Sequence, residues 1–229
     1  MIPRTARWLL ASFMTAGLHA QAPTIIVPGS AAVDGRKIPL ANSRYKSTMG
    51  GRSTDVLRDT IIDGKPALFR ILTVARPNVT TVDTTVLLRS TLAPIWKHAY
   101  AGTQRTFLEF HGTRVTGIRD HDGTVDSIDI ETPVPVFEAF SADLPLAALD
   151  LRENLHVRLP VYHSTLGFTW IDATIGAPQP MPGFERTWPI SIIEGSMKMT
   201  WFVDVKTREQ AGAVNALPTG GEVRITREP

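Results

Sequence analysis

Short runs of β-forming residues, separated by turn residues, dominate the chain from residue 52 onward. Thr54 to Ile62 and Ala67 to Ala75 are two such runs. The dipeptide Asp63-Gly64 between them suits a tight turn, because both residues tolerate positive φ. Together they predict a hairpin. The other predicted strands cover residues 80–88, 94–100, 104–110, 114–119, 124–130, 155–162, 167–175, 187–193, 198–205 and 222–226.

The polarity of these runs indicates how the strands are arranged. Most runs have one apolar face, and some, such as Ala67 to Ala75, are apolar on both. Short connections keep successive strands antiparallel. Twisted open sheets rarely exceed roughly ten strands. The sequence therefore predicts a mainly β fold, a single curved antiparallel sheet or half-barrel with meander order.

One segment interrupts the β pattern. Between residues 136 and 150 the apolar residues recur at helical spacing, which predicts one helix near 136–150 or two short ones bent at Pro145. We expect the segment to cover the open face of the sheet with an apolar stripe. The stripe consists of Phe137, Phe140, Leu144, Ala148 and Leu151.

The first 22 residues have the layout of a secretory signal peptide. Arg4 and Arg7 precede an apolar stretch from Trp8 to Leu18, and small residues follow at Ala20 and Ala22. The apolar stretch is well short of the ~20 residues of a membrane-spanning helix. We expect export to the periplasm or the extracellular space, with cleavage after Ala20 or Ala22. The predicted organisation is a removed signal peptide (1–22), a lead-in with an early strand (23–51) and one β domain (52–229).

The charge and the cysteine content of the chain limit the classes of function that the protein can have. Removal of residues 1–22 takes away two arginines and no acids, so Lys+Arg falls from 24 to 22 and equals Asp+Glu. A formally neutral protein has no electrostatic reason to bind nucleic acid. The absence of cysteine excludes disulfides, thiol catalysis and cysteine zinc sites. After the signal peptide no apolar run reaches membrane length, so an integral membrane protein is not expected.

Three segments carry a family resemblance: residues 87–94 (LLRSTLAP), residues 159–162 (LPVY) and residues 199–208 (MTWFVDVKTR). In this order they resemble the exported bacterial domains of unknown function grouped as DUF3108-like, over roughly residues 52–210. Those domains are similar in outline to the periplasmic lipoprotein carriers (LolA/LolB-like), a curved antiparallel sheet around a helical lid. The resemblance implies a fold, a cell-envelope location and, through the carriers, an acyl chain in the concave face.

No residue pattern points to a catalytic site, a metal or a cofactor. Asp120 to Asp126 gathers acids around Gly123, but it lacks the further ligands of a calcium loop and is read as a hairpin turn. The histidines after the signal peptide show no metal-ligand spacing; they are His98, His111, His121, His156 and His163. We expect no catalytic residues, no metal and no cofactor, and a hydrolase is the least favoured function.

Two functions remain open for the domain. It binds an apolar or amphiphilic ligand, a lipid or acyl chain, in the concave face, or it is a cell-envelope scaffold or adaptor that binds other proteins. Phe107 and Phe202 lie among polar neighbours on their strands, which means either exposed apolar surface or, as we favour, cover by the lead-in and the helical segment. The candidate ligand contacts are Phe107, Phe140, Leu144, Phe168, Trp170, Trp201 and Phe202.

Overall fold

The computed structural model describes residues 22–217 and 219–228. The predicted signal peptide lies outside this part of the chain except for Ala22 and stays a prediction. Seventeen strands lie within the described residues. They are β1 (Thr24–Ile25), β2 (Ala41–Ser47), β3 (Arg52–Ile62), β4 (Lys65–Arg76), β5 (Val79–Leu88), β6 (Pro94–Ala101), β7 (Gln104–His111), β8 (Arg114–His121), β9 (Thr124–Glu131), β10 (Phe137–Glu138), β11 (His156–His163), β12 (Gly167–Ile175), β13 (Gln179–Met181), β14 (Phe184–Glu194), β15 (Met197–Asp204), β16 (Gln210–Ala216) and β17 (Glu222–Arg227).

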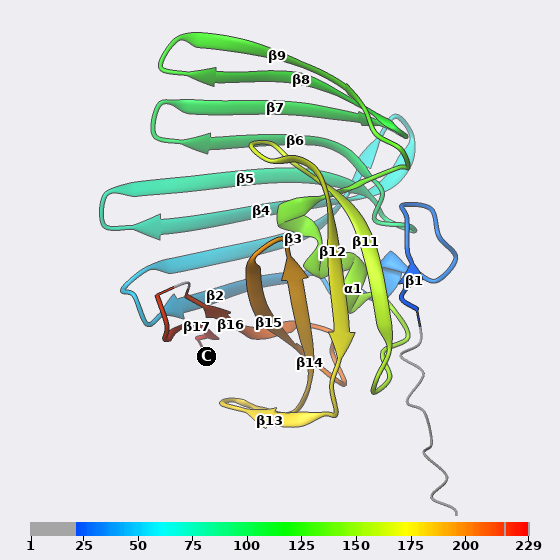
Figure 1. Cartoon of the computed structure of the whole chain (residues 1–229), viewed down its shortest axis with the longest axis vertical. Coiled ribbons are helices and arrows are strands. Elements are labelled where there is room, and N and C mark those ends of the chain that lie inside the picture. The colour runs from blue at the N-terminus through cyan, green and yellow to red at the C-terminus, as the bar shows by residue number, and fades with distance from the viewer. Residues whose placement is uncertain (1–21, 218, 229) are drawn as a thin grey trace, which may run out of the picture.

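All strands join one open, curved sheet, as the sequence predicts (Figure 1). Strands β2 to β9 form one antiparallel meander, and β11, β12 and β14 to β17 form a second, in which β13 also pairs with β14. Antiparallel pairing of β17 with β2 joins the two. The sheet is mixed, because the two-residue strands β1 and β10 lie parallel to β11, along different parts of it. The sheet is mainly antiparallel, as predicted, and the parallel pairs lie at this edge, where chain segments far apart in sequence meet.

Tight turns fix the register of the hairpins. Asp63 and Gly64 have φ values of 49° and 74°, and Asp122 and Gly123 have 52° and 84°, so both Asp-Gly pairs adopt the predicted left-handed conformation. The amide of Gly123 donates to Asp120 Oδ1 at 2.8 Å, which confirms the hairpin-turn interpretation of that acidic segment.

Three short strands were not predicted from the sequence: β10, which lies in the segment predicted as helical, β13 and β16. β13 lies in the stretch 177–183, whose three prolines give no strand pattern, and β16 carries the run QAGAVNA, whose small residues give little β signal. At Gly212 in β16 an added Cβ would lie 2.4 Å from the backbone oxygen of Ile225, so close strand pairing requires glycine there.

The helical segment is shorter and less regular than predicted. After β10 come a 3₁₀ turn (Ala139–Ser141) and one short α-helix, α1 (Asp143–Ala147). A third short helical turn, Gly35–Lys37, lies in the lead-in. A 3₁₀ turn advances about 120° per residue instead of 100°, so the helical phase changes at Phe140. Phe137, Leu144, Ala148 and Leu151 are buried, whereas Phe140 is 46% exposed, so the predicted five-residue stripe is wrong at Phe140.

The core lies on the concave side of the sheet, around the segment 137–151. Leu146, Leu159, Ile175 and Ile190 are fully buried in it, and Leu68 and Leu87 join them from the first meander. A second cluster forms where Tyr162 packs against Leu108, Phe110 and Val115. The end of the sheet near β9 therefore rolls over the outer side of β11.

Two buried cations attach the segment 138–143 to the concave face. Arg70 of β4 binds Asp55 of β3 at 2.6 Å and Asp143 of α1 at 2.6 Å. Lys97 of β6 binds Asp83 of β5 at 3.0 Å and Glu138 of β10 at 2.7 Å. Burial acts to lower the pKa of Arg70, but the carboxylates of Asp143 and Asp55 outweigh it and hold that pKa well above its usual range. Arg70 is therefore charged in the folded protein.

Replacing one of these cations should destabilise the fold strongly. Arg70→Met leaves two buried carboxylates without a counter-charge, and we expect a loss of about 3–5 kcal/mol in the free energy of unfolding, measured by urea titration. Arg58→Met is the matched control, because Arg58 is exposed on the adjacent strand β3; it should change the free energy by less than about 0.5 kcal/mol. Equal effects of the two changes would contradict the structural role of Arg70.

Candidate functional site

An apolar cavity of about 310 Å³ lies between the concave face of the sheet and the residues 139–143. Strands of both meanders line it, together with the 3₁₀ turn and α1. Its apolar wall consists of Leu72, Val74, Ala139, Phe140, Ile171, Ile192, Met197, Met199, Trp201, Ala213 and Ile225. A recess of about 30 Å³ shares Tyr45, Asp143 and Trp201 with it and reaches Leu144.

Strand alternation brings these side chains to one side. Ile192, Met199 and Asn215 occupy one row across β14, β15 and β16, because Met199 pairs with both neighbours. Residues two positions away on each strand face the same way. Met197 and Trp201 therefore face the cavity with Met199.

The pKa of Tyr45 indicates that this part of the cavity wall has a low dielectric constant. Its hydroxyl donates to the carbonyl oxygen of Gln210 at 3.1 Å, and burial, together with the charge of Asp55, raises its pKa to about 12. Because the phenol is neutral and its hydroxyl is hydrogen-bonded, the Tyr45 ring contributes a mainly apolar surface to the cavity wall.

Phe140 is placed by both buried cations. Its carbonyl oxygen accepts from Arg70 Nη1 at 3.2 Å, its amide donates to Glu138 Oε1 at 3.1 Å, and its ring lies 4.1 Å from Lys97 Nζ. The ring also lies 5.1 Å from that of His163. These two rings line both the apolar cavity and a polar cleft of about 490 Å³. They therefore stand between the two spaces.

Two polar atoms in the cavity wall have no hydrogen-bond partner among the described residues: Glu194 Oε1 and Asn215 Oδ1 are buried and unpaired. Burial raises the pKa of Glu194 above its ordinary range. Unpaired buried oxygens are costly, so a protein that keeps them has a candidate binding group.

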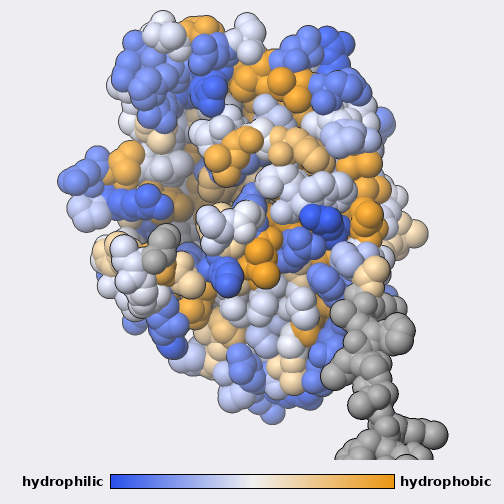
Figure 2. All heavy atoms as spheres, viewed as in Figure 1, coloured by the Kyte–Doolittle hydropathy of each residue, from blue (hydrophilic) through white to orange (hydrophobic). Residues whose placement is uncertain are grey.

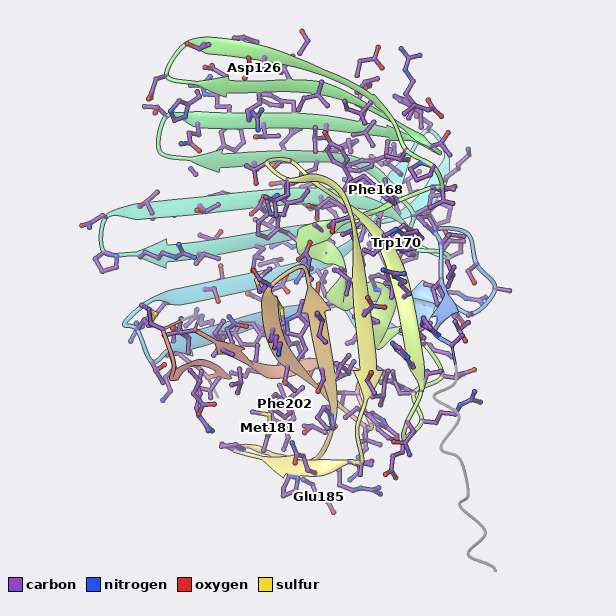
Figure 3. The ribbon with its side chains drawn as sticks, viewed as in Figure 1. Asp126, Phe168, Trp170, Met181, Glu185 and Phe202 are labelled. Carbon is purple, nitrogen blue, oxygen red and sulfur yellow. The ribbon has the colours of Figure 1, made fainter. Side chains whose placement is uncertain are left out.

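The structure places the seven candidate residues in several environments. Phe140 and Trp201 line the cavity and Leu144 lines its recess. Phe168 and Trp170 alternate with the cavity residue Ile171 and so lie on the outer face of β12, with their rings 5.5 Å apart. Both are labelled in Figure 3. Phe202 faces the opposite side of β15 from Trp201, opposite Gly212 and near Met181 of β13.

Phe107 belongs to an outward row of rings. It lies 4.7 Å from His98 and 5.9 Å from Tyr100, and Trp96 and Phe69 continue the row across β6 and β4. The helical segment contacts Lys97, whose side chain faces the other way. Cover of Phe107 by that segment, expected from the sequence, is therefore wrong, and Phe202 is buried near β13 instead.

Sequence reasoning missed Glu194, Asn215, Met197, Met199 and His163 as cavity residues. The alternation along β15 carries a usable signal, because Trp201 and Phe202 are adjacent and cannot share a face. Trp201 lies on the same face of β15 as Met197 and Met199, and that face is the cavity side.

The histidines of the described residues do not gather into a metal site. Within the described part of the chain, no group of three or more His, Asp or Glu side chains could hold a metal ion. Three histidines lie near acids, and all three pairs are largely exposed or half-exposed: His111–Glu109, His121–Asp122 and His156–Asp172. Burial and the charge of Lys97 lower the pKa of His163, whose Nδ1 accepts from the amide of Thr165. Its imidazole is thus neutral and held by a local turn.

On the face drawn in Figure 2, apolar side chains gather near the middle of the molecule, and hydrophilic ones cover most of the projecting turns. Among the helices that the structure describes, none has the length and apolar character needed to cross a bilayer.

Glu194→Gln should stabilise the protein at neutral pH. Because burial raises the pKa of Glu194, the folded state binds its proton more tightly than the unfolded state. Its contribution to stability is complete below about pH 4, near the unfolded pKa, and is lost as pH rises through the folded pKa. Urea unfolding should show equal stability of both proteins near pH 4 and a more stable variant at pH 7.

The matched control for this change is Glu185→Gln on the same strand. Glu185 is exposed, and its hydrogen bond to Lys206 lowers its pKa. That variant should gain no stability as pH rises. A Glu194→Gln variant that is less stable than the wild type at pH 7 would contradict the unpaired, desolvated state of Glu194.

No family model matches the chain, and no curated protein has a matching sequence. Among solved structures the fold is similar to the crystal structure of a beta-barrel-like protein of the domain of unknown function DUF1849 from Brucella abortus. The TM-score is 0.52 at 8% identity, over 83% of this chain and 97% of that chain. This likeness concerns the fold alone. It fits a β domain of unknown function, whereas the DUF3108-like and lipoprotein-carrier resemblance stays a prediction.

Proposed function

We propose that the protein binds an apolar or amphiphilic small molecule, such as a lipid or acyl chain, in the cavity of the concave face. The observation that carries this proposal is the apolar space of about 310 Å³ beside an otherwise closely packed core. Small-molecule sites range from ~300 to 1,000 Å³ and are mostly apolar with a few polar groups. This cavity has that size and lining.

The attachment of the segment 138–143 supports the same function. Ion pairs hold the segment in place, so its position does not depend on filling the space beneath it. The ring of Phe140 is half exposed at the boundary of the cavity and does not plug it. Met197 and Met199 supply flexible apolar walls that adapt to different chains.

We further propose that this binding takes place outside the cytoplasm. The support is the charge and hydropathy layout of residues 1–22, with Arg4 and Arg7 before an apolar stretch and small residues at its end. The ligand would then be a component of the cell envelope or its surroundings.

A brominated twelve-carbon alcohol tests the cavity directly. The sequence contains five tryptophans, of which Trp201 lines the cavity and Trp170 lies on the outer face of β12. We expect saturable fluorescence quenching in a variant without residues 1–22, and so without Trp8, that keeps only Trp201, with Trp96, Trp170 and Trp188 changed to Phe. A variant that keeps only Trp170 is the control and should show no saturable quenching. Equal quenching in both variants, or none in either, would count against the proposal.

One observation favours the second function, an adaptor of the cell envelope. The row of Phe69, Trp96, His98, Tyr100 and Phe107 forms an apolar surface on the outer face of β4 to β7, with exposed Ile118 beside it. Aromatic surfaces of this kind are enriched in protein interfaces.

Affinity capture from an envelope extract distinguishes this function from ligand binding. If the row is an interface, one stoichiometric partner should be recovered with the wild type and lost with Phe107→Ser. Ile193→Ser is the control, because Ile193 is also exposed but lies on β14. Recovery that is unchanged by Phe107→Ser would rule out this surface as the interface.

A further inference from the structure

The unpaired oxygens of Glu194 and Asn215 lie in the same wall of the apolar cavity. Glu194 ends β14 and pairs with Met197 across the turn at Gly195-Ser196, while Asn215 of β16 pairs with Met199. Met197 and Met199 share a face of β15, so both polar side chains lie on the concave side. Each has one buried oxygen without a hydrogen-bond partner among the described residues.

The charges in the cavity wall are unbalanced. Among the described residues, Arg70 is the sole arginine or lysine that lines the cavity itself, against the three carboxylates of Asp55, Asp143 and Glu194. Arg208 and Glu209, of opposite charge, line the adjoining recess and leave this excess unchanged. Arg70 is fully engaged, since its guanidinium donates to Asp55, to Asp143 and to the carbonyl oxygen of Phe140. His163 is neutral because burial and Lys97 lower its pKa. No cation of the described wall is therefore left for Glu194.

The hydrogen-bonding capacity of the two oxygens determines which ligand head group can bind them. An ionised carboxylate only accepts hydrogen bonds, and so does an amide oxygen. A ligand that satisfies both must bring donors, and a positive charge would also balance the excess of carboxylates. A carboxylate or phosphate head group would bring neither and would meet a like charge in a low-dielectric space.

We propose that Glu194 and Asn215 form a head-group subsite for a primary ammonium carried by an otherwise apolar ligand. The subsite presupposes the apolar-ligand function proposed above, because the alkyl part of the ligand occupies the same cavity. The subsite adds a prediction about the head group of that ligand: an alkylamine binds in preference to a fatty acid.

Twelve-carbon ligands with different head groups test the subsite. Binding of dodecylamine, dodecanol and dodecanoate, each below its critical micelle concentration at pH 7, is measured by displacement of a neutral fluorescent apolar probe. We expect dodecylamine to bind about tenfold to a hundredfold more tightly than dodecanoate, because hydrogen bonds to charged groups have effects of this size. Dodecanol should lie between them.

Variants then assign the preference to the two residues. Glu194→Gln should weaken dodecylamine binding by about tenfold or more while leaving dodecanol nearly unchanged, and Asn215→Ala should weaken it by a smaller factor. Glu185→Gln on the same strand should change nothing, since Glu185 is exposed and bonded to Lys206. Urea unfolding of each variant checks that the fold is kept.

The outcomes separate the subsite from the underlying function. Equal binding of all three ligands to the wild type, or an amine preference that survives Glu194→Gln, would overturn the subsite and leave the apolar-ligand function standing. Failure of all three ligands to displace the probe, or of the probe itself to bind, would overturn both.

Discussion

The arrangement of the whole concave side depends on two buried cations. Arg70 and Lys97 each join a carboxylate of a neighbouring strand to one of the segment 138–143. Removing one partner from such a cluster is expensive, although the intact cluster contributes little net stability over apolar packing. Their contribution is geometric, because the bonds fix the distance and orientation of the segment relative to the sheet.

This polar attachment explains why a cavity can persist beside a dense core. A lid held only by apolar contacts would gain stability by collapsing into the space beneath it. Here Phe140 is held through its backbone by Arg70 and Glu138, and its ring rests against Lys97 at the cavity boundary. The cavity wall is then free to carry groups that do not serve packing, and Glu194 and Asn215 are the clearest of them.

The hairpins were predictable because their information is local. Alternation along each strand and Asp-Gly dipeptides at Asp63 and Asp122 determine the turns, and the observed φ values agree. The helical segment was predictable in place but not in form. Its apolar spacing suggests one helix or two short ones, whereas β10, a 3₁₀ turn and α1 follow one another there. In this arrangement Glu138 and Asp143 bind two cations on different strands. β13 and β16 were not predicted, because prolines around β13 and small residues in β16 give little β-strand signal in the sequence.

The sequence by itself determined the class of the fold, its curvature and the position of the covering segment, since these follow from alternation, turn chemistry and strand number. Only the tertiary structure decided which side chains share the cavity. Lys97 meets Glu138 across 41 positions and Arg70 meets Asp143 across 73. Such contacts depend on the curl of the sheet and on the pairing of β17 with β2, which no local pattern encodes. For the same reason Trp201 reaches the cavity while Phe168, Trp170 and Phe107 lie outside it: the strand gives a side chain two possible faces, and the rolled sheet determines what each face meets.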